Sequence, residues 1–187
     1  MDALTALHTR NSINLLCEPG PNSEQLNNIV KAGLRACDHR SLTPWKFLLI
    51  EGEARRKFGD LMVKAKESAD QQPISIELSA KMRSKPMRAP TILVVVAAIK
   101  EHDKVPEVEQ VLSAGAAAQM MMTAAHAQGV GAIWRSGSLM FTDEMRQGLN
   151  LTPTDKIVGF IYLGTAKVAK PLPSHKTSDF LEHWTGE

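Results

Sequence analysis

The sequence predicts a mixed α/β or α+β fold, built as one domain over residues 1–187. Segments rich in β-branched residues alternate along the chain with segments that have helical spacing, which is the pattern of a mixed fold. A length of 187 residues suits a single hydrophobic core. With 43% hydrophobic and 22% charged residues, the composition excludes a disordered, collagen-like or disulfide-rich chain.

Two helices are predicted before the first strand. Asp2 can cap a short helix whose Leu4 and Leu7 share one face. Asn22 and Gln25 have the spacing of a capping box, which begins a second helix. The apolar positions of this second helix recur at helical spacing: Leu26, Ile29, Val30, Gly33 and Leu34.

Strands and helices then alternate to residue 164. The predicted strands are residues 46–50, 91–99, 130–136 and 156–164. The predicted helices are residues 53–71, 74–84 and 106–128, and a short one beginning at residue 142. The apolar run 91–99 indicates a strand covered on both faces. Residues 167–187 contain two prolines and no periodicity, so we expect a C-terminal extended arm.

The helix over residues 106–128, with Gly129 as its stop, is unusual. No charged residue lies between Val111 and Trp134, but the content of Ala, Gly, Ser, Gln and Thr is too polar for a membrane span. We therefore expect a buried helix and no membrane partner. The small side chains on most faces of this helix require that it be buried, and a chain of 187 residues can hardly surround a helix of this length. This favours a homodimer with the helix near the interface.

Charge and cysteine content narrow the function classes. The chain has 22 Lys and Arg against 20 Asp and Glu, a formal net charge of +2, which excludes a polybasic nucleic-acid binder. Cys17 and Cys37 are too few for a disulfide framework, so two free thiols in a reducing, cytoplasmic setting are expected. The first residues lack the pattern of a signal peptide.

Three polar clusters lie at the ends of predicted elements, where sites tend to be built: residues 10–12, 35–39 and 134–136. A guanidinium beside a serine hydroxyl suits a phosphate monoester, which offers three acceptor oxygens. Arg10 and Arg135 together would balance its charge of about −2, so we expect them to converge on one phosphate. The alternative is that each arginine is an ordinary surface residue.

Other chemistries fit the sequence poorly. Residues 129–131 follow a helix and lack the further glycine of a dinucleotide fingerprint, since Trp134 stands there. Cys37 and His39 are only two residues apart, which disfavours a nucleophile and its base. Six histidines without paired spacing predict no metal site.

The order of these segments resembles the flavin-dependent nitroreductase family, in particular its smallest bacterial members. The resemblance runs from Met1 to Thr165. Residues 10–12 are similar to the family's Arg-x-Ser signature, and residues 35–45 to its loop ending in Pro-Trp. Residues 128–137 are similar to its Gly-x-Gly turn and phosphate strand.

This resemblance implies an α+β, nitroreductase-like fold: a central, mostly antiparallel sheet flanked by helices, in an intertwined homodimer with one FMN in each of two interface clefts. By position, the FMN residues would be Arg10, Asn11, Ser12, Arg35, His39, Trp134, Arg135 and Ser136. Of these, Arg35 and His39 would come from the partner chain, with His39 a candidate proton donor. The nicotinamide nucleotide would contact Ala124, Ala125, His126, Ala127, Gln128 and Gly129.

The implied activity is an FMN-dependent NAD(P)H oxidoreductase that reduces nitroaromatics, quinones or similar small acceptors by ping-pong hydride transfer, with no catalytic side chain required. Three alternatives stay open: a flavin dehydrogenase or reductase with a non-nitro substrate, a non-catalytic flavin-binding dimer, and a metal- or thiol-dependent hydrolase. Asn14 stands where many family members have a cation facing the flavin. The short chain also predicts an open, shallow cleft.

Overall fold

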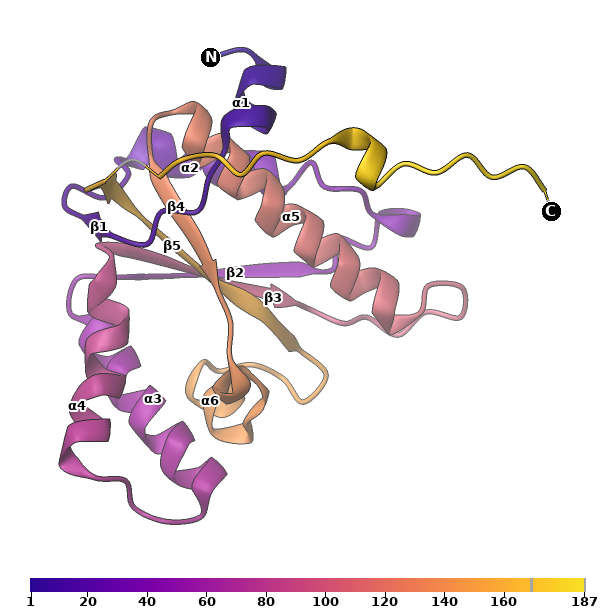
Figure 1. Ribbon diagram of the computed structural model, residues 1–187. Helices are drawn as coiled ribbons and strands as arrows, with labels where there is room; N and C mark the ends of the chain where they lie inside the picture. The colour runs from indigo at the N-terminus through magenta and orange to yellow at the C-terminus, as the bar shows by residue number, and fades with distance from the viewer. Residues whose placement is uncertain (169, 187) are drawn as a thin grey trace.

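A five-stranded sheet forms the centre of the molecule in the computed structural model, which describes residues 1–168 and 170–186 (Figure 1). Its strands are β1 (Leu16–Cys17), β2 (Trp45–Glu51), β3 (Thr91–Ala97), β4 (Gly131–Arg135) and β5 (Lys156–Ala166). β5 pairs with β1, β3 and β4, and β3 also pairs with β2. All four pairings are antiparallel within the described residues, which confirms the expected sheet.

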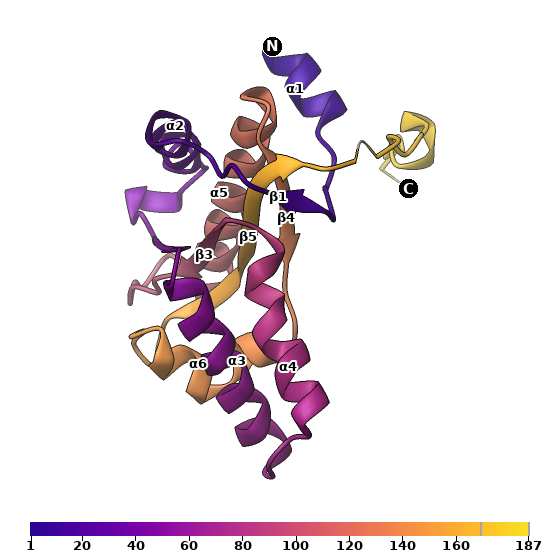
Figure 2. The same cartoon turned by 90° about the vertical axis from the view of Figure 1, so that its left-hand side faces the viewer.

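Helices cover both faces of this sheet (Figure 2). The helices are α1 (Ala3–Thr9), α2 (Ser23–Gly33), α3 (Ala54–Asp70), α4 (Ile76–Ser84), α5 (Glu107–Ala127) and α6 (Asp143–Gly148). One core lies between the sheet and α3, α4 and α6, and the other between the sheet and α2 and α5. All seven residues of β3 are buried, as the continuous apolar run predicts for a strand covered on both faces.

Local capping follows the sequence closely. The Asp2 carboxylate accepts a hydrogen bond from the Thr5 amide at 3.1 Å and begins α1. Asn22 and Gln25 form the reciprocal capping box of α2, with bonds of 2.8 and 2.9 Å. Gly129, which follows α5, has a φ of +76°, the left-handed conformation that glycine adopts without strain.

Helix α5 is buried on one side only. Ala114, Ala118 and Met121 are fully buried in the core beneath it. Val108 and Leu112 are 61% and 66% exposed, so a single protomer leaves an apolar stripe of α5 uncovered. Within one protomer α5 is therefore covered on one side only, and its cover by a second copy stays a prediction.

The C-terminal segment leaves the body of the protein (Figure 1). Residues 169 and 187 of the expected arm lie outside the described residues. Residues 170–186 form one 3-10 turn, η4 (Thr177–Asp179), and no other regular element. Asn11 Nδ2 donates to the carbonyl oxygens of Lys170 and Pro171, at 3.0 and 2.9 Å, and holds the beginning of this segment. Beyond it, Phe180 and Trp184 are exposed.

Candidate functional site

The first predicted cluster, residues 10–12, lies beside the start of β4. Thr9 Oγ1 is 2.9 Å from His126 Nε2 in the last turn of α5, which directly precedes β4. The Ile13 amide donates to the Ala132 carbonyl oxygen at 2.9 Å. The segment from Arg10 to Ile13 therefore lies between the last turn of α5 and the first residues of β4.

The third predicted cluster lines a cavity of about 340 Å³ at the other end of β4. The cavity opens between β4, β5 and the α3–α4 side of the sheet. Its lining residues are Met62, Lys85, Arg88, Trp134, Arg135, Ser136, Gly137, Ser138, Leu139, Met145, Phe160 and Tyr162. The lining does not include Arg10, so the structure does not gather both predicted arginines in this one cavity.

Positive charge dominates the cavity. Lys85, Arg88 and Arg135 line it, and no carboxylate is among its lining residues. Partial burial lowers the pKa of the Lys85 ammonium, and three nearby cations lower it further: Arg88, Lys81 and Lys66. A cavity of this charge attracts an anion.

Tyr162 lines the same cavity as Arg88 and Arg135. Burial raises the pKa of its hydroxyl to about 12, and the positive charges of Arg135 and Arg88 partly oppose that rise. The Arg135 guanidinium lies 5.6 Å from the centre of the Tyr162 ring, a distance suited to a cation–π contact. The hydroxyl therefore stays protonated at neutral pH and is available as a hydrogen-bond donor.

Two buried guanidinium nitrogens have no hydrogen-bond partner within the described residues: Nη1 of Arg10 and Nε of Arg135. A buried donor left unpaired costs about 1–3 kcal/mol. Each belongs to one of the two predicted phosphate-binding clusters. Since the chain itself leaves both guanidinium groups incompletely satisfied, an anionic ligand fits the donor set that these two segments offer.

Adjacent residues of β4 point to opposite faces of the sheet, as in any strand. The Trp134 indole packs against Gly159, where an added Cβ would lie only 2.1 Å from the indole nitrogen. It belongs to the core under α5, whereas Arg135 reaches over Tyr162 on the other face. Trp134 thus fixes the end of β4 through packing.

The second predicted cluster, residues 35–39, does not line the cavity of its own protomer. Arg35 is exposed, and His39 Nδ1 lies 2.6 Å from Glu109 Oε2 on α5. The adjoining Arg40, Ser41 and Thr43 have φ values of 63°, 52° and 48°. These left-handed conformations are strained for non-glycine residues, and such strain concentrates at functional sites. Delivery of Arg35 and His39 by a partner chain stays a prediction.

The segment predicted for the nicotinamide nucleotide, residues 124–129, lies at the start of β4, away from the cavity. His126 contacts Thr9, and Gln128 Nε2 donates to the carbonyl oxygens of Gln25 and Ala124 at 3.3 and 3.1 Å. These polar groups therefore serve contacts within the chain. Ala124 and Ala127 line a separate apolar groove between α1 and α5. Nucleotide binding by this segment stays a prediction.

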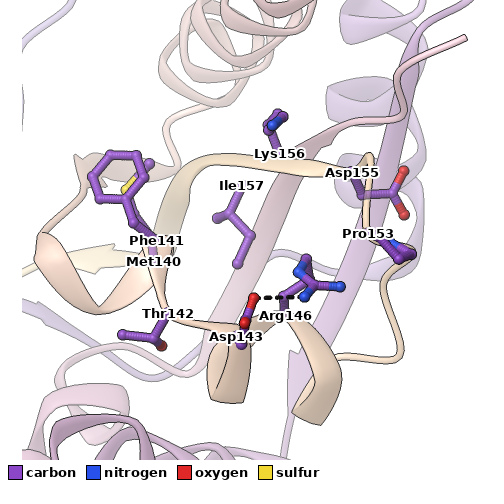
Figure 3. A pocket seen from close by; sticks show the side chains of 9 residues that line it. All are labelled: Met140, Phe141, Thr142, Asp143, Arg146, Pro153, Asp155, Lys156 and Ile157. Atoms are coloured by element: carbon purple, nitrogen blue, oxygen red, sulfur yellow. Dashed lines mark hydrogen bonds and ion pairs between the residues drawn. The ribbon is translucent and has the colours of Figure 1, made fainter. Parts of the chain in front are cut away.

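A second cavity, of about 270 Å³, lies beyond η3 (Ser138–Phe141) (Figure 3). Its charged groups are already paired: Arg146 with Asp143 at 2.5 Å, and buried Asp155 with the Thr152 amide at 2.9 Å. Lys46 approaches Asp155 as well, at 3.5 Å. Because the chain satisfies these groups itself, the cavity at the end of β4 is the better candidate site.

Neither a metal cluster nor a membrane helix marks another site in the part of the chain that the structure describes. Over residues 1–168 and 170–186, no three His, Cys, Asp or Glu side chains gather where they could hold a metal ion. None of the helices in these two ranges combines the length and the apolar character that crossing a bilayer requires.

Lys85, Arg88 and Tyr162 were missed by the sequence reasoning. A signal was present, because four basic residues lie between positions 81 and 88, directly before the buried strand β3. A basic run normally indicates a solvated surface. Its position at the end of an element, next to a buried strand, is what distinguishes this one.

Comparison with known proteins defines the class. The Nitroreductase family pattern matches residues 10–165. The chain therefore belongs to the nitroreductase family, as its motifs indicated. It is 46% identical over 168 residues to YdjA of Escherichia coli strain K12, a protein named as a candidate NAD(P)H nitroreductase, with 90% of each chain covered. A Haemophilus influenzae protein with a similar name is 36% identical over 186 residues, covering 98% of this chain and 100% of its own.

Solved structures show the same fold. A nitroreductase-like family protein from Bacillus cereus superposes with a TM-score of 0.80 at 20% identity, covering 98% of this chain and 96% of the other. A nitroreductase with bound FMN from Bacteroides fragilis superposes with a TM-score of 0.74 at 19% identity, covering 97% and 98%.

Proposed function

We propose that this protein is an FMN-dependent NAD(P)H oxidoreductase that reduces nitroaromatics, quinones or similar acceptors. The family makes it a nitroreductase-type oxidoreductase. The observation that carries the cofactor assignment is the pair of incompletely satisfied arginines, Arg10 and Arg135, on two segments along one strand. The FMN in the Bacteroides fragilis structure supports the same assignment.

The two segments suit an elongated anionic ligand. Arg10 and Ser12, beside the start of β4, would hold the phosphate and the ribityl chain. Residues 134–136, at the end of β4, would hold the ring end. Arg10 and Arg135 would thus hold different parts of the ligand, because Arg135 lines the cavity and Arg10 does not. The expectation that both grip one phosphate stays a prediction. Asn11 would act indirectly, since its amide group binds the C-terminal arm.

When bound between these residues, FMN would supply the redox chemistry, hydride uptake from a reduced nicotinamide and electron delivery to the acceptor, which predicts ping-pong kinetics. The positive charges of Lys85 and Arg135 favour an electron-rich, anionic ring system. The protonated Tyr162 hydroxyl can donate a hydrogen bond in the same cavity. His39, oriented by Glu109, is the candidate proton donor from the partner chain.

We also propose a cytoplasmic homodimer. Free Cys17 and Cys37 suit a reducing compartment. The uncovered stripe of α5, with Val108 and Leu112, and the exposed apolar side chains of the arm give a second copy a surface to bury. Light scattering of the purified protein should give twice the chain mass of 20.5 kDa, whereas a monomer at micromolar concentration would contradict the homodimer.

An absorbance scan tests the function. Purified protein should be yellow, with an oxidised-flavin spectrum that bleaches when NADH or NADPH is added without oxygen. Colourless protein that stays empty after incubation with FMN would refute the proposal. Flavin that binds and never bleaches would instead favour a non-catalytic flavin-binding dimer. Steady-state comparison of quinones, enones and nitroaromatics would separate a nitroreductase from a flavin reductase with another substrate.

A further inference from the structure

Arg88 is the outermost cation of the cavity at the end of β4. It closes the 3-10 turn η2 (Lys85–Arg88), which carries it from α4 to the beginning of β3. Its side chain is exposed, while Lys85 and Arg135, which line the same cavity, are half-buried. Arg88 is therefore at the rim, where a ligand entering from solvent would meet it.

The charge at this rim is not neutralised by the chain. Within the described ranges, no carboxylate pairs with Arg88, Lys85 or Lys81. Two nearby carboxylates bind other cations: Asp60 accepts from Arg83 at 2.7 Å, and Asp70 from Lys66 at 2.6 Å. The positive potential therefore remains directed at whatever occupies the cavity.

The remaining wall is apolar and suits a ring. Met62, Leu139, Met145 and Phe160 line the cavity behind the cations. A volume of about 340 Å³ is at the small end of the range for ligand pockets. The apolar inner wall suits the flavin ring of the proposed function, which leaves the exposed Arg88 at the rim for a negative charge on a molecule that stacks on that ring.

We propose that Arg88 selects electron acceptors that carry an anionic substituent, such as a carboxylate on an aromatic ring. This inference rests on the proposed function, because it takes the end of β4 as the place where acceptors meet the flavin. Arg88 binds the substituent at the rim, and the acceptor's ring stacks on the flavin, whose own ring the inner part of the cavity would hold. Neutral acceptors of the same shape bind more weakly.

The test compares two ligands of nearly equal shape, 4-nitrobenzoate and 4-nitrobenzamide. Their dissociation constants are measured on the FMN-loaded enzyme from changes in flavin absorbance, without nicotinamide. The wild type should bind the carboxylate about tenfold more tightly, the effect of one charge-assisted hydrogen bond at a partly exposed site. Arg88→Gln should lose most of this preference, and Arg88→Glu should reverse it.

Lys64→Gln is the matched control, since Lys64 is an exposed cation of α3 that does not line the cavity. It should keep the preference. Equal binding of the two ligands by the wild type, or an equal loss in Lys64→Gln and Arg88→Gln, would overturn the inference. Arg88→Gln could instead keep the preference for the carboxylate and change the preference for NADPH over NADH. That result would assign Arg88 to binding of the nicotinamide donor and would also overturn the inference. Failure of the wild type to hold FMN would instead refute the proposed function.

Discussion

The two ends of β4 carry similar polar residues in different surroundings. At its start, His126 contacts Thr9, Gln128 bonds to Gln25, and the Ala132 carbonyl accepts from Ile13. At its end, Arg135 lines a cavity with two further cations and no carboxylate. Apart from Arg10, whose buried Nη1 has no partner within the described residues, these polar groups at the start are thus satisfied by the chain, and the charges at the end are not.

Along this one strand, the polar groups that stabilise the fold therefore differ from the charged groups that are left for a ligand. A group that bonds to its own chain contributes to the free energy of unfolding. A charge that the chain leaves uncompensated lowers the free energy of unfolding, and such charges are typical of sites where a ligand binds them. Substitutions at the two ends should therefore change different measured quantities, and the following experiments test that separation.

The largest effect is expected from Arg135→Ala. Loss of one charge-assisted contact costs about 1.5–3 kcal/mol, so FMN should bind roughly ten- to a hundredfold more weakly, measured by equilibrium dialysis. The melting temperature of the flavin-free protein should change little, because Arg135 Nε has no hydrogen-bond partner to lose within the described residues and the side chain gives up only its cation–π contact with Tyr162. Unchanged FMN retention would remove Arg135 from the site.

Gly159→Ala should be next in size. The added methyl would overlap the Trp134 indole, and overpacking of this kind costs about 1–3 kcal/mol. Thermal unfolding should show a lower midpoint in the flavin-free protein. Gly115→Ala is the control, because its Cβ would lie 3.9 Å from the same indole, an ordinary contact. Equal melting temperatures for the two variants would contradict the packing role of Trp134.

Gln128→Ala should have a smaller effect, and on stability alone. It removes the hydrogen bonds to Gln25 and Ala124, worth about 1 kcal/mol of unfolding free energy, measurable by urea titration. FMN affinity should stay at the wild-type value. A raised KM for NADH in this variant would support the prediction that residues 124–129 bind the nicotinamide nucleotide, and loss of FMN would break the contrast between the two ends of β4.

The smallest effect is expected from Arg40→Gly. Relief of the left-handed conformation at φ 63° should stabilise the protein by about 1 kcal/mol in the same titration. Arg40→Ala is the control, because it removes the same side chain and keeps the strain. If the free energy of unfolding rises equally in both variants, removal of the side chain rather than relief of the backbone conformation explains the rise.

Local signals made most of the fold predictable. The cap at Asp2 and the capping box of Asn22 and Gln25 act within four residues, so the sequence alone contains them. The burial of β3 follows from seven consecutive apolar or β-branched residues. Strand β1 escaped prediction because it is two residues long and exists only through its pairing with Thr165 and Ala166.

The candidate site was less predictable, for a physical reason. Arg10 and Arg135 were identified from their motifs, but which cavity each one lines depends on tertiary packing. Lys85 and Arg88 belong to a basic run whose cavity is formed partly by β4 and β5, more than 40 residues later in the chain. Nor could the pairing of Asn11 with residues 170 and 171 be read from either segment alone.

The hydrogen bonds of Asn11 have a consequence for how the protein responds to dilution. Asn11 lies between Arg10 and Ser12, so the arm and the proposed phosphate-binding turn share one side chain. If the arm docks on a second copy, association and flavin loading are linked, and each strengthens the other by the same factor. Flavin content should then rise with protein concentration, and a dilute sample should shed its colour as the copies separate.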